Sequence, residues 1–301
     1  MITSRNKPWS ALSLFIFLEI AWQSIKLHDK PPPRPMRIAI LDLYEGEVNE
    51  GMRCILQLVA QFKAEAPIPV EHQVFDVRLK NEIADLSFDA YISSGGPGSP
   101  IASQGSEWEQ NYFGLMKGIL EHNRNNPFQR KHVFLICHSF QIFCRYYGYA
   151  KVSKRKSTSF GALPIHKTKA GLKEPLFTGL EDPFYAVDSR DYQIIQPDEG
   201  KIWSGGGNIL CIEKDRPFIA LERAVMAIRF NEAIIGMQFH PEADSDSLYM
   251  YLLRDDKKKM IIDKHGERRY QQMLGMINEP DKIKLTYKTI IPNFLHMALN
   301  Q

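Results

Sequence analysis

The sequence predicts an α/β fold with a doubly wound, mostly parallel central sheet flanked by helices, followed by a helical C-terminal extension. Between residues 37 and 148, short apolar runs alternate with amphipathic stretches, a pattern typical of parallel strands connected by helices. Beyond residue 149 the apolar runs are separated by turn residues, which indicates mixed or antiparallel strands. After Glu242 the chain turns polar and helical.

The first half of the chain supplies the parallel strands and the helices between them. Each apolar run is short and continuous, as expected for a strand that is buried on both faces. Each intervening stretch repeats its apolar residues at helical spacing, as Ile55, Val59 and Phe62 do. The predicted strands cover 37–43, 74–77, 90–93 and 133–137, and the predicted helices cover 50–63, 106–122 and 139–148.

The second half is expected to fold back onto the same domain. We therefore predict one domain over residues 36–245 and a helical extension over residues 246–301. The apolar segment 290–295 of this extension could pack on the core or on a partner, and both alternatives stay open. The predicted strands of this half cover 160–166, 184–187, 209–213, 218–221, 225–229 and 234–239.

Residues 1–35 precede the first predicted strand and have a different character. Arg5 and Lys7 stand before an apolar run at 11–18, which is interrupted by Glu19 and is far shorter than the roughly 20 residues that span a bilayer. We expect an extension outside the fold and no membrane insertion. A targeting or anchoring segment is the alternative.

The charge balance and the cysteines restrict the classes of function. A net charge of +3, from 38 basic and 35 acidic residues, gives no reason to expect nucleic acid as a partner. The four cysteines lie in apolar stretches without a CxxC pair, so we expect buried free thiols and a cytoplasmic setting. No spacing of His, Cys and Asp indicates a metal site, and no cofactor is expected. The cysteines are Cys54, Cys137, Cys144 and Cys211.

Three reactive side chains follow predicted strands. Cys137 ends one strand immediately before a predicted helix, His240 ends another strand, and Glu242 stands two residues later. In an open parallel sheet such groups gather beyond the carboxyl ends of the strands. A thiol, a base and a carboxylate that orients the base are what covalent acyl transfer by cysteine requires. Gly95 and Gly96, after a third strand, could offer backbone N–H groups to an oxyanion.

Four segments form motifs with these residues: Ser94–Pro100, Cys137–Gln141, Pro175–Leu180 and Gly236–Glu242. Together they resemble class I (triad-type) glutamine amidotransferases over residues 36–245, and most closely the amidotransferase domain of GMP synthetase. In that family the cysteine attacks the carboxamide of glutamine, which gives a γ-glutamyl thioester and ammonia. The resemblance therefore implies the same fold and the same reaction for this chain.

The resemblance also implies a role for each matching residue. Cys137 would be the nucleophile, His240 the general base and Glu242 the carboxylate that orients the base. The remaining residues would stabilise the oxyanion or contact the glutamine. They are Gly96 and the backbone N–H of His138 for the oxyanion hole, and Gly95 and Gln141 for the substrate.

The chain departs from the family pattern around the cysteine. The family has glycine two residues before and two residues after the cysteine, where this chain has Leu135 and Ser139. Small residues at these positions relieve crowding at a strained turn. Phe140 replaces a frequent histidine, and the segment Val187–Asp191 lacks a substrate-side histidine. We therefore expect a triad like that of the family and a glutamine pocket that differs from it.

These features predict hydrolysis of the glutamine side-chain amide through a cysteine thioester, with ammonia passing to a separate acceptor synthetase. The sequence has neither a Walker-type P-loop nor a Ser-Gly-Gly-x-Asp-Ser pyrophosphatase loop, so the acceptor would be another protein. One alternative is a γ-glutamyl hydrolase acting on another γ-glutamyl amide or peptide, which Phe140 and Arg190 favour. The other is a catalytically silent homologue acting as a binding or regulatory subunit, which Leu135 and Ser139 favour.

Overall fold

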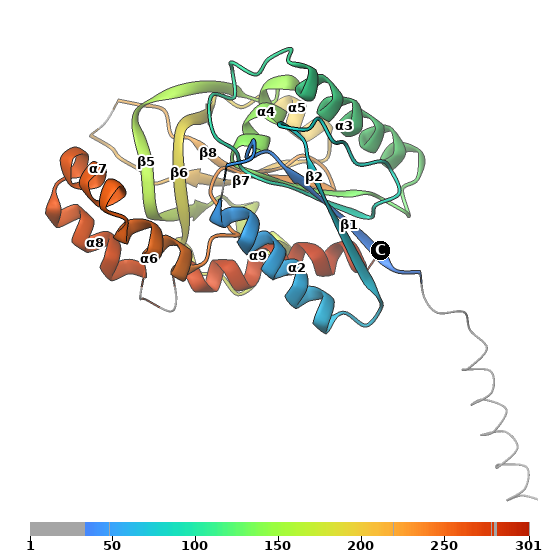
Figure 1. The fold of residues 1–301 in the computed structure, drawn as a ribbon. Coiled ribbons are helices and arrows are strands. Elements are labelled where there is room, and N and C mark those ends of the chain that lie inside the picture. The colour runs from blue at the N-terminus through green and yellow to red at the C-terminus, as the bar shows by residue number, and fades with distance from the viewer. Residues whose placement is uncertain (1–33, 48, 219, 278, 280–281, 301) are drawn as a thin grey trace, which may run out of the picture. The chain divides into compact units, whose positions relative to one another are not determined.

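The computed structural model describes residues 34–300 apart from 48, 219, 278 and 280–281, and Figure 1 shows its fold. Residues 36–301 make up one compact unit. The expected extension over residues 1–35 lies outside the described residues except for its last two positions. None of the described helices combines the length and the apolar character needed to cross a membrane.

A mixed sheet of nine strands forms the centre of the described unit. Its parallel strands are β1 (Met36–Asp42), β2 (Val70–Asp76), β3 (Ala90–Ser93), β4 (His132–Ile136) and β9 (Ile234–Met237). They lie in the order β2-β1-β3-β4-β9. The chain places β2 on one side of β1 and β3 on the other, so a crevice opens between β1 and β3 at their carboxyl ends.

Helices cover both faces of this parallel half. They are α2 (Glu50–Glu65), α3 (Glu107–Asn125), α4 (His138–Tyr146) and α9 (Ile283–Leu299). Figure 1 shows α2 and α9 on one face of the sheet and α3 and α4 on the other. In β1, Ile38 and Ile40 pack in the cluster with α2 and α9, whereas Ala39 and Leu41 pack in the cluster with α3 and α4. All four side chains are fully buried, which explains the continuous apolar run. The predicted α/β fold is confirmed.

The other half of the sheet is antiparallel and continues the order as β9-β8-β7-β5-β6. Its strands are β5 (Lys151–Lys167), β6 (Phe184–Ile195), β7 (Asn208–Glu213) and β8 (Val225–Arg229). The connecting helices are η1 (Gly171–Lys173), η2 (Pro175–Phe177) and α5 (Glu199–Ser204). Only residues 165–167 of β5 pair with β7, whereas residues 151–154 and 159–165 pair with β6. We call these two strands the β5–β6 ribbon.

The C-terminal helices cover two different parts of the sheet. The helices α6 (Ser245–Leu253), α7 (Asp255–His265) and α8 (Glu267–Ile277) pack on the β5–β6 ribbon through a hydrophobic cluster of their own. In contrast, α9 returns to the parallel half, where Phe294 is fully buried in the core. The helical C-terminal region is therefore confirmed, and its segment 290–295 packs on the core.

The prediction of a strand at residues 218–221 is wrong. The described residues of this segment form an irregular loop between β7 and β8, in which Phe218 is 98% exposed and Leu221 is 47% exposed. Because β7 and β8 pair directly with each other, the apolar residues between them have no strand to join. Conversely, β5 starts at Lys151, well before residue 160, because its charged residues alternate with buried ones such as Val152.

Candidate active site

Cys137 lies at the sharp turn between β4 and α4. Its backbone angles are φ 47° and ψ −95°, and a positive φ is uncommon for a residue other than glycine. This turn places the thiol at the carboxyl edge of the sheet and at the N-terminus of α4, where the first-turn N–H groups favour negative charge. The residue is 6% exposed, and it lines the cavity described below.

Ser139 stabilises this turn at a position where the family-like pattern has glycine. Its hydroxyl accepts a hydrogen bond from the N–H of Ile136 at 2.8 Å. The same oxygen lies 2.9 Å from the carbonyl oxygen of Ser93 and 3.0 Å from that of Ile136. Because Ser93 ends β3, the hydroxyl ties the turn to the neighbouring strand.

Leu135 and Phe140 fit without blocking the thiol. Leu135 is fully buried among side chains of α3 and α4, because alternate residues of β4 point to opposite faces of the sheet. Phe140 packs on Gly236 of β9, where an added Cβ would lie 2.3 Å from the Cδ2 atom of the phenyl ring. A glycine on the neighbouring strand therefore makes the room that Phe140 needs.

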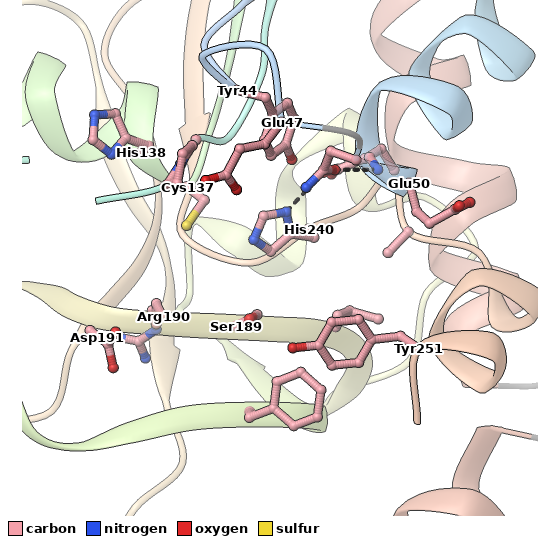
Figure 2. Close-up of a pocket in the computed structure, with 18 of the residues that line it drawn as sticks. Tyr44, Glu47, Glu50, Cys137, His138, Ser189, Arg190, Asp191, His240 and Tyr251 are labelled. Atoms are coloured by element: carbon pink, nitrogen blue, oxygen red, sulfur yellow. Dashed lines mark hydrogen bonds and ion pairs between the residues drawn. The ribbon is translucent and has the colours of Figure 1, made fainter. Parts of the chain in front are cut away.

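His240 and Glu242 follow β9, the strand next to β4. The Nδ1 atom of His240 lies 2.8 Å from Oε1 of Glu242, and the side chain of Glu242 is 1% exposed. The backbone N–H of His240 donates to the carbonyl oxygen of Val187 in β6 at 2.8 Å. The carboxylate holds a proton on Nδ1 and leaves Nε2 free for the thiol. Figure 2 shows the imidazole ring directed toward Cys137.

The surroundings of His240 favour its protonated form. Burial alone lowers the pKa of His240, but the charges of Glu242 and Cys137, together with the hydrogen bonds that both make to the ring, raise this pKa well above its ordinary value. A nearby opposite charge acts in this direction because it stabilises the imidazolium. The geometry therefore favours an imidazolium paired with the sulfur of Cys137.

Gly95 and Gly96 approach this pair from the end of β3. A Cβ on Gly95 would lie 3.0 Å from Cε1 of His240 and 3.1 Å from the hydroxyl of Tyr44. A Cβ on Gly96 would lie 2.5 Å from the carbonyl oxygen of Leu43. Gly96 therefore has no room for a side chain, and a side chain at Gly95 would push the imidazole ring. Gly96 also lines the cavity, whereas Gly95 packs against the imidazole ring.

His138 begins α4, and its ring points away from His240 (Figure 2). Burial, and then the charges of Arg78 and Arg145, lower the pKa of His138 to about 3. The ring is therefore neutral at physiological pH and is a weak base. His138 can therefore contribute to the site through its backbone N–H, as the predicted oxyanion hole requires.

Gln141 is connected to the cysteine through Gln238, which sequence reasoning did not single out. The Nε2 atom of Gln141 donates to Oε1 of Gln238 at 3.2 Å and to the carbonyl oxygen of Tyr192 at 3.3 Å. Gln238 in turn donates from Nε2 to the sulfur of Cys137 at 3.7 Å. Gln238 stands two residues before His240, and residues at this spacing lie on the same face of an extended strand. This spacing is the sequence feature that could have indicated Gln238.

Tyr44 is a second residue that sequence reasoning missed. It follows β1 as Cys137 follows β4, and an added Cβ on Gly51 or Gly95 would lie 2.5 or 3.1 Å from its hydroxyl oxygen. Burial, and then the charges of Glu242 and Cys137, raise the pKa of Tyr44 well above its ordinary value. The hydroxyl therefore stays protonated and can donate a hydrogen bond. The position of Tyr44 just after a predicted parallel strand is the sequence feature that could have indicated it.

One cavity of about 470 Å³ connects these groups, a size suited to a small molecule. The β5–β6 ribbon and α6 form its opposite side (Figure 2). Within the described ranges, no group of His, Cys, Asp or Glu side chains is arranged to hold a metal ion. The predicted site residues that line the cavity are Cys137, His240, Glu242, Gly96, His138 and Gln141.

The family model for glutamine amidotransferase class-I matches residues 55–260, more than half of the chain. This chain belongs to the class I glutamine amidotransferase family. The matched range contains Cys137, His240 and Glu242. The positions of these residues in the amidotransferase fold, at the ends of adjacent strands, agree with the motifs that first indicated the family.

Known proteins resemble this amidotransferase at low sequence identity. A glutamine amidotransferase from Thermotoga maritima has a TM-score of 0.63 and 14% identity, with 89% of this chain and 100% of that chain covered. The glutaminase domain of CTPS from Trypanosoma brucei, solved with bound acivicin, has a TM-score of 0.52 and 13% identity, with coverage of 88% and 94%. These two likenesses show the fold alone. A homoserine O-acetyltransferase from Catenibacterium mitsuokai is 22% identical over 241 residues, which cover 76% of this chain and 72% of that protein.

Proposed function

We propose that this amidotransferase hydrolyses the side-chain amide of glutamine through a thioester on Cys137 and releases glutamate and ammonia. The observation that carries the proposal is the thiol at a strained strand–helix turn, facing a His240–Glu242 pair joined at 2.8 Å. Covalent acyl transfer by cysteine requires these three groups. The family assignment supports glutamine as the acyl donor.

The proposed reaction has two steps. The sulfur of Cys137 attacks the carboxamide carbon, while the backbone N–H groups of Gly96 and His138 stabilise the negative oxygen. His240 delivers a proton to the nitrogen, the C–N bond breaks and ammonia leaves. Water then gives a proton to His240 and attacks the thioester carbon, so that glutamate departs and the thiol is restored.

The ammonia would be used by a separate acceptor protein. The 301 residues contain neither a Walker-type loop nor a pyrophosphatase-type loop for ATP. An ATP-dependent amination is therefore not assigned to these residues. The name of one structural neighbour, the glutaminase domain of CTPS, places glutaminase activity in a unit distinct from the rest of that enzyme, which supports a distinct glutaminase unit here.

A second candidate function is transfer of an acyl group from Cys137 to a hydroxyl acceptor in place of water. The similarity to a homoserine O-acetyltransferase over 76% of the chain favours it. A thioester on Cys137 serves both reactions, which differ in the acyl donor and its leaving group in the first step and in the nucleophile of the second step. An assay with acetyl-CoA and homoserine distinguishes this candidate from the first.

The test compares release of glutamate and ammonia from L-glutamine by the full chain and by Cys137→Ala. We expect turnover to fall about 10⁴-fold or more, to background, since removing the nucleophile abolishes covalent catalysis. Cys144→Ala is the matched control. Cys144 lies on the same helix but is fully buried in the core, so its variant should keep turnover.

Each other outcome selects a different function. Turnover by Cys137→Ala equal to that of the full chain would contradict the proposal. Cleavage of other γ-glutamyl amides without glutamine turnover would favour the γ-glutamyl hydrolase, and acetyl transfer to homoserine would favour the acyltransferase. A chain with no turnover and an unreactive Cys137 would be a silent homologue.

A further inference from the structure

An apolar patch lines part of the candidate active-site cavity, on the side opposite Cys137. On this side β6 also contributes polar lining residues, namely Ser189, Arg190 and Asp191. Beside them lie five apolar or aromatic residues that belong to, or pack against, the hydrophobic cluster beneath α6, α7 and α8. We call these residues the apolar wall, and they are Phe160, Val187, Ala243, Leu248 and Tyr251.

The apolar wall begins at the backbone of His240. The carbonyl oxygen of Val187 accepts the N–H of His240 at 2.8 Å, and the N–H of Ala243 donates to the carbonyl oxygen of His240 at 3.3 Å. In Figure 2, Tyr251 extends from α6 with its hydroxyl toward the cavity, across from Cys137 and His240. The wall therefore begins at the residues bonded to the backbone of His240 and faces the imidazole across the cavity.

This position determines which part of a substrate meets the wall. The nitrogen that leaves the acyl group must receive a proton from His240, so it lies on the imidazole side of the thiol. A substituent on that nitrogen then lies in the part of the cavity next to His240, where the backbone contacts of Val187 and Ala243 place the apolar wall. Ammonia has no substituent, so hydrolysis of glutamine makes no use of this surface.

The apolar wall is already formed in the chain by itself. The rings of Tyr251 and Phe160 lie 5.3 Å apart at 38°, and Nζ of Lys257 lies 5.3 Å from the centre of the Tyr251 ring. At the start of α6, Asp244 forms an ion pair with Arg53 of α2 at 2.7 Å. Preformed apolar surface of this kind binds apolar ligand groups at a small ordering cost.

We infer that the substrate class includes γ-glutamyl amides whose nitrogen carries an apolar or aromatic group, bound by the apolar wall. This inference rests on the proposed function, because it uses the same thioester. The C–N bond of the substituted amide breaks as the S–C bond forms, and His240 protonates the departing amine. Water then hydrolyses the thioester and releases glutamate, as it does with glutamine.

The test uses γ-glutamyl benzylamide and γ-glutamyl methylamide, two alkylamides that differ mainly in the ring. We expect kcat/KM to be about tenfold or more higher for the benzylamide, as is usual for a group that fills an apolar pocket. Tyr251→Ala should lower this ratio about tenfold, whereas Tyr251→Phe, which keeps the ring, should preserve it. Tyr249→Ala is the matched control, because Tyr249 lies on the same helix and is 39% exposed outside the cavity lining.

The outcomes separate this inference from the proposed function. Glutamine turnover with no preference for the benzylamide, or with the same ratio in Tyr251→Ala as in the full chain, overturns the inference and leaves the proposed function intact. Absence of turnover with glutamine and with both amides overturns both. A ratio that falls in Tyr251→Ala but not in Tyr251→Phe or Tyr249→Ala supports the apolar wall as the binding surface for the amine.

Discussion

Two walls enclose the candidate active site, and they differ in origin and in chemistry. The first is built from the carboxyl ends of parallel strands and presents Cys137, His240 and the glycines after β3. The second is the apolar wall, built from the β5–β6 ribbon and α6. The first wall holds the groups that react in the proposed mechanism, whereas the second holds apolar and aromatic groups beside the polar Ser189, Arg190 and Asp191 of β6. Substitutions in the first wall should therefore change kcat/KM for all amides alike, and substitutions in the second wall should change the preference among amides.

The largest effect that tests this separation is expected from Glu242→Gln. We expect kcat/KM to fall about 100-fold for glutamine and for both substituted amides, because a neutral amide orients and charges His240 less well. The charge of Glu242 helps to raise the pKa of His240, so the variant should have a lower pKa there. The imidazolium that protonates the leaving nitrogen exists only below the pKa of His240, so the alkaline limb of the pH profile should move to lower pH.

The measurement is kcat/KM against pH for the full chain, for Glu242→Gln and for Glu121→Gln as a control. Glu121 is an exposed carboxylate on α3, and its variant should match the full chain. A loss confined to one amide would contradict the separation of the two walls. An alkaline limb that does not move would contradict the role given to Glu242.

A smaller effect is expected from Gly95→Ala. The added Cβ would lie 3.0 Å from Cε1 of His240, so the ring must shift by a few tenths of an ångström. We expect about a tenfold loss in kcat/KM that is equal for all amides, because misplacing the base slows the chemical step. Gly114→Ala is the control, since a Cβ there meets no atom within 4 Å. A changed ratio between amides would show that Gly95 acts on the substrate.

The smallest effect on catalysis is expected from Ser139→Ala, which tests the rigidity of the first wall. The change removes the acceptor for the buried N–H of Ile136, so the free energy of unfolding should fall by about 1–3 kcal/mol. Denaturant unfolding of the full chain and the variant measures this difference. An unchanged free energy would mean that Ser139 does not hold the turn.

The first wall was largely predictable from the sequence. β3 was predicted with the bounds that the structure has, because four buried residues followed by two glycines indicate a strand end. The strand before Cys137 was equally clear, since all five residues of β4 are buried. The structure then brings together residues that are separated by about a hundred positions, because β4 and β9 are adjacent.

The second wall was not predictable in the same way. The exposed charges at the start of β5 hid its alternation, so the ribbon was predicted to begin at residue 160. Tyr251 belongs to a helix whose sequence shows amphipathic periodicity but not the surface on which it packs. Its contact with Phe160 joins positions about ninety residues apart and depends on the ribbon. Tyr44 was missed because a tyrosine after an apolar run is usually part of the core.

The central claim is that the first wall makes Cys137 a nucleophile. It is tested most directly by treating the full chain with a glutamine analogue that carries an electrophile and locating the label by mass spectrometry. All four cysteines are free, but only Cys137 lines the cavity, and Cys54, Cys144 and Cys211 are fully buried. We predict a label on Cys137 alone, slowed by added glutamine. A label on Cys54, Cys144 or Cys211 instead, or an unlabelled Cys137, would contradict the account.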